Sequence, residues 1–176
     1  MALPPGTHRL GPGRSKLLVK TYREGLAAKV GHDLVIEVTA WEATLDGDAK
    51  AVELTADARS LQVREGVRGV KPLTDKDRAD IRKTIDEKVL RGQPIAFRST
   101  AMREQANGLS VEGELTIGGA TRPAAATLQL DGARVSATIP LTQSDFGIKP
   151  YRGLMGALKV RDELEIVIDA RLDDER

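Results

Sequence analysis

Cysteine is absent from this chain of 176 residues, and histidine occurs only twice. Without cysteine there can be no disulfide framework, thiolate nucleophile or cysteine-ligated metal. His8 and His32 form no His-x-x-x-His or similar spacing, so the sequence predicts no metal site. It also contains no phosphate-binding loop, dinucleotide fingerprint or Gly-x-Ser-x-Gly motif. We therefore expect no cofactor and no catalytic residues.

Aromatic residues make up only 3% of the chain, and neither sign of charge is in marked excess. The 27 Lys and Arg residues are interspersed with 26 Asp and Glu, so no basic stripe is offered to a nucleic acid. No apolar run approaches the roughly 20 residues that span a bilayer, so we expect no membrane span. The N-terminus lacks the features of a signal peptide. This predicts a soluble cytoplasmic protein, or a periplasmic or secreted one if a leader was removed.

Apolar residues that alternate with polar ones dominate the sequence, and this period is typical of strands with one solvated face. The clearest run has Leu164, Ile166 and Ile168 alternating with Glu165 and Asp169. The full set of strand-like runs is 15–23, 34–40, 52–58, 95–103, 109–117, 124–130, 135–141 and 164–172.

Glycine pairs such as Asn107-Gly108 and Asp131-Gly132 separate several of these runs and favour tight hairpins. About eight strands is the number at which a sheet can close and lose its edges. The sequence therefore predicts a mainly β fold, an eight-stranded antiparallel barrel over residues 13–172. Residues 1–12, rich in proline and glycine, are expected to be a flexible segment, and residues 173–176 a loose tail.

One segment breaks the alternation and predicts a single inserted α-helix. Thr74 and Asp77 have the spacing of a capping box, and Ile81, Ile85 and Val89 then recur every four residues. A glycine and a proline shortly afterwards end the pattern. Such a helix can cover one end of the barrel, where a ligand would enter, or pack on the outer surface, and the sequence leaves both arrangements open.

Four motifs occur in a fixed order along the chain. They are Gly31-His32-Asp33-Leu34, Pro94-Ile95-Ala96-Phe97-Arg98-Ser99-Thr100, Leu115-Thr116-Ile117-Gly118-Gly119-Ala120-Thr121-Arg122-Pro123 and Ser144-Asp145-Phe146-Gly147-Ile148. In these motifs and their order the chain resembles the YceI-like family over about residues 6–172. The resemblance implies an extended, lipocalin-like barrel with a long apolar lumen, and characterised members hold polyisoprenoid chains there.

Three features depart from the family pattern, one of them the absence of the signal peptide that is common in the family. Gly118 stands where the family's hairpin motif has a histidine, so a head-group contact from that position would be missing. The charged helix from Asp75 to Leu90 replaces a His-Leu and Asp-Phe-Phe segment of the family. The entrance to the lumen is therefore expected to be built differently.

We expect the barrel interior to bind an apolar isoprenoid or lipid-like ligand, with a role in transport. The predicted ligand-binding residues are Leu34, Ile36, Val38, Phe97, Leu115, Ile117, Leu128, Ile139, Phe146, Ile166 and Ile168. Small inward-facing residues favour an open lumen over a core filled by side chains. These are Ala56, Ala58, Gly113, Ala124, Ala126 and Ala137.

Two other functions stay open from the sequence. A filled barrel would be an interaction or stress-related scaffold module with no small ligand. A lipid-modifying enzyme would need His32 and Asp145, although a loop-orienting His32 is the simpler interpretation. Asp145 is likewise expected to cap backbone N–H groups, while Phe146 and Ile148 anchor its turn in the core. The sequence also leaves open whether the chain forms a homodimer.

Overall fold

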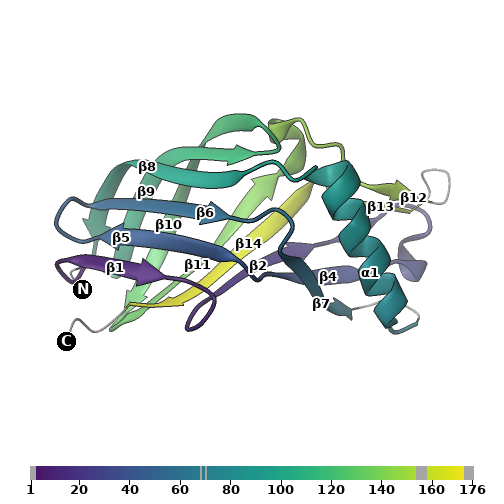
Figure 1. Cartoon of the computed structure of the whole chain (residues 1–176), viewed down its shortest axis with the longest axis horizontal. Helices are drawn as coiled ribbons and strands as arrows, with labels where there is room; N and C mark the ends of the chain where they lie inside the picture. The colour runs from purple at the N-terminus through teal and green to yellow at the C-terminus, as the bar shows by residue number, and fades with distance from the viewer. Residues whose placement is uncertain (1–2, 68, 70, 154–157, 173–176) are drawn as a thin grey trace.

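The computed structural model of the chain describes residues 3–67, 69, 71–153 and 158–172, and it is mainly β with one principal helix (Figure 1). Eleven strands form one antiparallel sheet. They are β1 (Thr7–Leu10), β2 (Lys16–Thr21), β4 (Asp33–Val38), β5 (Trp41–Asp46), β6 (Ala51–Ala56), β7 (Leu61–Val67), β8 (Ile95–Gln105), β9 (Gly108–Ile117), β10 (Ala120–Asp131), β11 (Arg134–Thr142) and β14 (Glu163–Arg171). The strand order across the sheet is β1-β5-β6-β8-β9-β10-β11-β14-β2-β4-β7.

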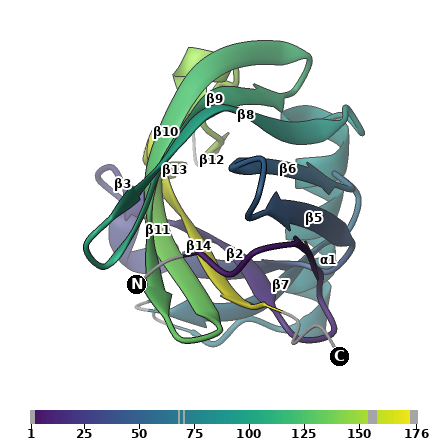
Figure 2. The same cartoon turned by 90° about the vertical axis from the view of Figure 1, so that its left-hand side faces the viewer.

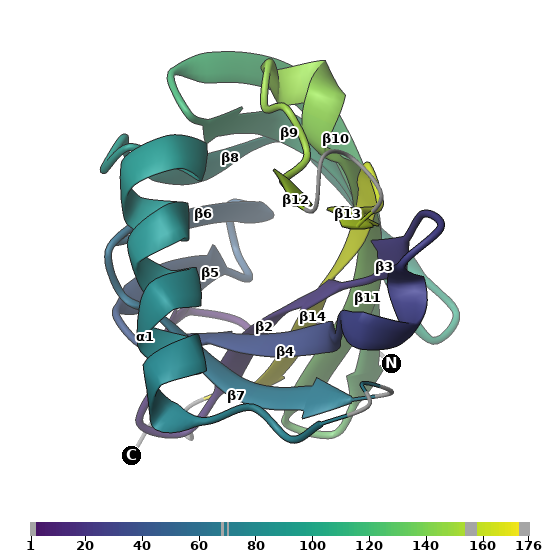
Figure 3. The same cartoon turned by 90° about the vertical axis from the view of Figure 1, so that its right-hand side faces the viewer.

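A second sheet and the helical segments lie at one end of the molecule (Figures 1 and 3). The small sheet has the order β12-β13-β3. Its strands are β3 (Arg23–Glu24), β12 (Arg152–Gly153) and β13 (Leu158–Val160). The helical segments are the 3₁₀ turns η1 (Ala28–Val30) and η3 (Gln143–Phe146), the α-helix α1 (Asp75–Thr84) and its π-helical continuation η2 (Ile85–Val89). Among the helices that the structure describes, none combines the length and the apolar character that crossing a membrane requires.

The predicted antiparallel barrel is confirmed as a barrel-like β fold, but the number of strands is corrected from eight to eleven. The eight predicted runs correspond to β2, β4, β6, β8, β9, β10, β11 and β14. The sequence analysis missed β1, β5 and β7, which neighbour β2, β4 and β6 along the chain and are separated from them by short breaks. Across the last two breaks the backbone stays paired, since Thr39 N donates to Ser60 O and Asp57 N to Ala40 O, each at 2.9 Å. The edge strands β1 and β7 thus flank the same segment, β4–β5, and the sheet curls around an interior (Figure 2).

The predicted turn chemistry holds in part: Gly132 has a φ of 60°, whereas neither Asn107 nor Gly108 has a positive φ. Gly118 and Gly119, between β9 and β10, have φ angles of 60° and 83°. Positive φ at both central residues is the geometry that matches the right-handed twist of the flanking strands, and side chains with a Cβ rarely adopt it. The residue that replaces the family's histidine therefore belongs to a tight turn, and it is exposed.

Part of the N-terminal segment is ordered in the sheet, in contrast to the expected flexible residues 1–12. β1 pairs with β5 from Thr7↔Asp46 to Leu10↔Ala43. Leu3 and His8 are both buried, and His8 Nε2 lies 3.2 Å from Pro4 O. The buried Leu3 packs into the apolar core at the end of the molecule that carries both termini (Figures 1 and 2).

The helix begins where the sequence predicted. Thr74 Oγ1 accepts a hydrogen bond from Asp77 N at 3.1 Å, and Asp77 Oδ2 accepts one from Thr74 N at 2.9 Å. This reciprocal pair is a capping box, and its hydrogen bonds to Thr74 hold the pKa of Asp77 below its ordinary value. The chain leaves the helix through Gly92, whose φ is 67°.

Candidate ligand-binding site

The interior contains a cavity of about 450 Å³ at the end of the molecule where α1 lies. Most of its wall comes from inward-facing residues of nine strands of the large sheet, because every second side chain of a strand points to the same face; the nine are β2, β4, β6–β11 and β14. In β14, for example, Leu164, Ile166 and Ile168 line the cavity while Glu165 and Asp169 do not. The volume lies within the range of small-molecule binding pockets, about 300–1,000 Å³.

The structure places all but one of the predicted ligand-binding residues on this wall. Those on the wall are Leu34, Ile36, Val38, Phe97, Leu115, Ile117, Leu128, Ile139, Ile166 and Ile168. Phe146 is the exception: it is only 7% exposed and packs in the adjoining apolar core, but it does not line the cavity. The predicted anchoring of this turn is confirmed, because Phe146 is buried and Ile148 packs against the same core.

Small residues contribute to the open space in two ways. Ala56, Ala124 and Ala126 line the cavity directly. Gly113 does not, but a Cβ at Gly113 would lie 2.6 Å from Cζ of Phe97. The glycine therefore lets the Phe97 ring lie against β9, where a larger side chain would push it aside. Ala58 and Ala137 belong to the packed core instead.

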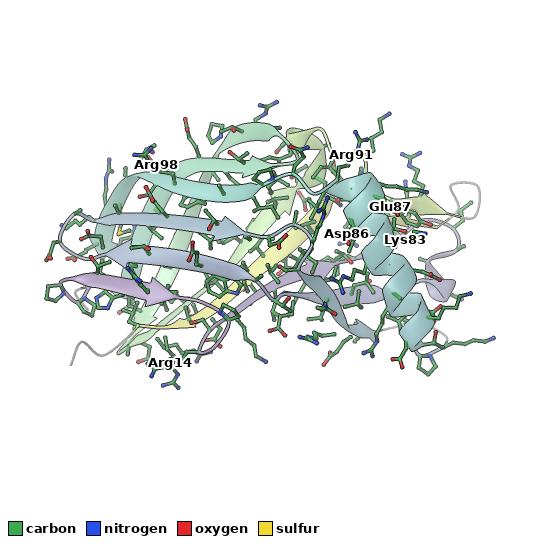
Figure 4. The ribbon with its side chains drawn as sticks, in the orientation of Figure 1. Arg14, Lys83, Asp86, Glu87, Arg91 and Arg98 are labelled. Atoms are coloured by element: carbon green, nitrogen blue, oxygen red, sulfur yellow. The ribbon has the colours of Figure 1, made fainter. Side chains whose placement is uncertain are left out.

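The helix closes one side of the cavity, which the sequence left undecided. Ile81, Ile85 and Val89, the residues of its predicted apolar stripe, all line the cavity. These three side chains are partly exposed where they border the cavity, and they also pack against the apolar core that includes Ile36 and Leu90. On the outer side, Lys83 and Glu87 are exposed to solvent (Figure 4). The strands thus form most of the cavity wall, and the helix closes one side of it.

Polar groups in the lining belong to segments at the helical end. They are Thr21, Asp80, Thr84, Gln143 and Tyr151. Thr84 Oγ1 donates to Asp80 O at 3.0 Å, and the buried Gln143 uses Nε2 to donate to Arg161 O at 3.0 Å. Sequence reasoning missed these groups, because all but Thr21 come from helical segments or loops, where strand alternation gives no inward direction. An apolar interior with a few polar groups at one end suits a ligand that has an apolar tail and a polar end.

The structure places His32 and Asp145 in different surroundings. The His32 ring nitrogen Nε2 hydrogen-bonds Lys71 O, which ties the start of β4 to the segment before α1. Asp145 is exposed, and the expected capping by its carboxylate is wrong: Asp162 accepts from Ser144 N at 2.8 Å and from Ser144 Oγ. Within the described residues no group of three or more His, Asp or Glu side chains is placed to hold a metal ion.

A polar recess of about 280 Å³ lies beside the small sheet and is lined by Tyr22, Arg23, Asp33, Arg161 and Glu165. Its groups bind one another. Tyr22 Oη donates to Glu165 at 2.7 Å, Arg23 N donates to Asp33 at 2.9 Å, and the Arg161 guanidinium lies 5.8 Å from the centre of the Tyr22 ring. These contacts attach the small sheet to the outer face of the barrel, which accounts for the recess structurally.

Comparison with known proteins agrees with this geometry. A family model described as the YceI-like domain matches residues 19–172. The chain belongs to the YceI-like family. A search of curated proteins finds no match.

Solved structures of similar fold include proteins of two bacteria. The crystal structure of Burkholderia cenocepacia BcnA aligns with a TM-score of 0.64 and 17% identity, over 92% of this chain and 98% of that one. The Campylobacter jejuni YCEI protein aligns with a TM-score of 0.54 and 13% identity, over 80% and 85% of the two chains. A mutant of the latter with a monobromobimane guest gives a TM-score of 0.59 at 12% identity, again over 80% and 85%. At these identities the likeness establishes the fold.

Proposed function

We propose that this protein binds an apolar chain of isoprenoid or lipid type inside the barrel and carries it through water without chemical change. The observation that carries the proposal is the cavity of about 450 Å³, whose wall is made of Leu, Ile, Val, Ala and Phe side chains over most of its extent. Membership of the YceI-like family, known for polyisoprenoid-binding barrels, supports the same ligand class.

The physical chemistry of the wall favours burial of a hydrocarbon chain. Each methylene group removed from water contributes about 0.8 kcal/mol. Ordering a flexible chain and desolvating its polar end offset part of this gain. A tail placed between Phe97, Leu115 and Ile166 would leave a polar end near Thr84 and Gln143. In that orientation the polar end keeps hydrogen-bond partners, which avoids the cost of burying it unpaired.

The two alternative functions receive less support. A filled-barrel scaffold would need side chains to occupy the interior, and the cavity of about 450 Å³ favours an open interior instead. A lipid-modifying enzyme would bring His32 and Asp145 together on the ligand, yet neither residue lines the cavity. His32→Ala and Asp145→Asn should therefore leave ligand binding unchanged, and any turnover of a bound lipid that these variants abolish would contradict a purely binding role.

The direct test is native mass spectrometry and organic extraction of freshly purified protein, followed by titration with an isoprenoid quinone. Trp41, the single tryptophan, packs in the same apolar core as Ile36 and Val38, so its fluorescence can report occupancy. We expect a co-purifying apolar molecule or saturable binding of the quinone. Protein that is repeatedly empty and also fails to bind isoprenoid quinones and straight-chain lipids would refute the proposal.

A further inference from the structure

One leucine at the helical end of the barrel is almost fully exposed. Leu26 lies in the turn between β3 and η1 and is 98% exposed, the largest exposure of a big apolar side chain among the described residues. Tyr151, which precedes β12, is 46% exposed and at the same time lines the cavity. We call the β3–η1 turn with η1 and residues 149–152 the open rim. These segments lie at the end where the helix covers the cavity (Figures 1 and 3).

The open rim carries positively charged side chains that form no ion pair within the described residues. Lys29, Lys149 and Arg152 are exposed, and no ion pair involves their side chains within the described part of the chain. Of the neighbouring acids, Glu24 is paired with Lys159 at 3.4 Å and with Arg161 at 4.0 Å. Asp162 accepts hydrogen bonds from the neutral Ser144 and keeps its charge, and Asp145 is exposed. The rim segments themselves, residues 25–30 and 149–152, contain these three cations and no Asp or Glu, so their own charge around the exposed leucine and the tyrosine is positive.

This combination matches an anionic lipid surface better than a protein partner. An exposed apolar side chain gains by entering the interface of a bilayer, and tyrosine is favoured at headgroup depth. Each lysine or arginine near an anionic bilayer adds about 1 kcal/mol of attraction. A stable protein interface requires a continuous buried area of about 1,000 Å² or more, whereas here single apolar residues are separated by charges.

We propose that the open rim docks on an anionic membrane, with Leu26 inserted among the headgroups and the mouth of the cavity facing the bilayer. An apolar ligand could then pass between bilayer and cavity without crossing water, where exposure of its chain is costly. Docking goes beyond the proposed binding function and does not depend on it, because the rim residues other than Tyr151 do not line the cavity.

Co-sedimentation of the full chain with lipid vesicles tests the proposal. We expect binding to vesicles of phosphatidylcholine mixed with phosphatidylglycerol, weaker binding to phosphatidylcholine alone, and weakening by added salt. Leu26→Glu should lower the partition coefficient at least about tenfold, because a buried leucine contributes about 1.5–3 kcal/mol. Lys29→Gln with Lys149→Gln should lower it by about fivefold per removed charge.

The matched control is Arg98→Gln with Arg103→Gln, which removes two exposed charges from β8. Arg98 lies on the barrel wall away from the helical end (Figure 4). This variant should bind anionic vesicles almost as well as the unmodified chain. Quinone titration without vesicles should be unchanged in Leu26→Glu, so a failure of docking can be told from a failure of ligand binding.

Three results would overturn docking on a membrane. The first is a chain that stays in the supernatant with both kinds of vesicle. The second is equal loss of binding in the rim and control variants, which would indicate only a general charge effect. The third is a concentration-dependent dimer in sedimentation velocity that Leu26→Glu dissolves while vesicles remain unbound, which would assign the rim to a protein contact.

Discussion

The two ends of the barrel have the same kinds of inward-facing residue. They differ in whether other side chains fill the space that these residues enclose. At the end with the termini, Leu45 and Leu109 are 1% and 0% exposed, and Leu3 and Met102 pack among them. We call this the packed end. At the helical end, residues such as Leu115 and Ile166 remain partly exposed because they border the cavity.

The difference shows that alternation decides which side chains point inward. It does not decide whether these side chains contact one another across the interior. At the packed end the N-terminal segment enters the interior, with Leu3 in the core and His8 buried. At the helical end, α1 stands along one side of the opening, and its stripe borders the cavity from that side. Protein interiors normally pack to the density of organic crystals. Here part of the interior stays open, because α1 remains at the side of the barrel and does not fill it.

The largest contrast should appear when leucines of the two ends are truncated. Leu109→Ala at the packed end should lower the free energy of unfolding by about 3 kcal/mol or more, since it creates a new cavity among fully buried side chains. Leu115→Ala should cost clearly less, because it enlarges a space that already exists. Urea denaturation of both variants measures this, and equal losses would mean that the two ends are packed alike.

Enlarging a small residue should have opposite consequences at the two ends. Ala137→Leu, in the packed core, should destabilise the fold by about 1–3 kcal/mol through overpacking. Ala124→Leu, on the cavity wall, should leave stability nearly unchanged but lower the affinity for an isoprenoid quinone about tenfold by occupying its space. Thermal denaturation and quinone titration separate the effects. Undiminished quinone binding by Ala124→Leu would place the ligand elsewhere.

The helix should affect ligand binding through one face only. Ile85→Asn places a polar side chain on the cavity and should weaken quinone binding by about fivefold to tenfold, since an apolar contact is replaced by a group without a partner. Lys83→Asn, on the exposed outer side of the same helix, is the matched control and should bind as the unmodified chain does. If both variants lost affinity equally, the helix would act through its folding and not through its face.

The smallest effect concerns the capping box that starts the helix. The pKa of Asp77 is lowered in the folded state by its hydrogen bonds to Thr74, so its contribution to stability is present above the unfolded pKa, near 3.8, and is lost as the pH falls below it. Asp77→Asn should lower the Tm at neutral pH by on the order of 1–2 °C, and this difference should vanish at strongly acidic pH. Glu87→Gln, which lies outside the capping box, should show no such pH dependence, and a pH-independent loss in Asp77→Asn would argue against the box.

The sequence determined the barrel wall and the start of the helix, because both depend on interactions between residues close along the chain. The period of two placed Ile36, Leu128 and Ile166 on the inner face, and the Thr74–Asp77 spacing set the helix boundary. Hairpin glycines such as Gly118 follow from the same local rules.

The tertiary structure alone decided the course of the N-terminus and the place of the cavity. β1 is held by pairing with β5, which lies more than thirty residues away along the chain. No local pattern in the four residues of β1 predicts this pairing. Phe146 points into the core beside the cavity, since its direction is set by the turn at η3 and not by strand alternation. The positions of α1 and Leu3 in the folded chain determine which apolar residues border the cavity. Contacts between distant parts of the chain fix these positions.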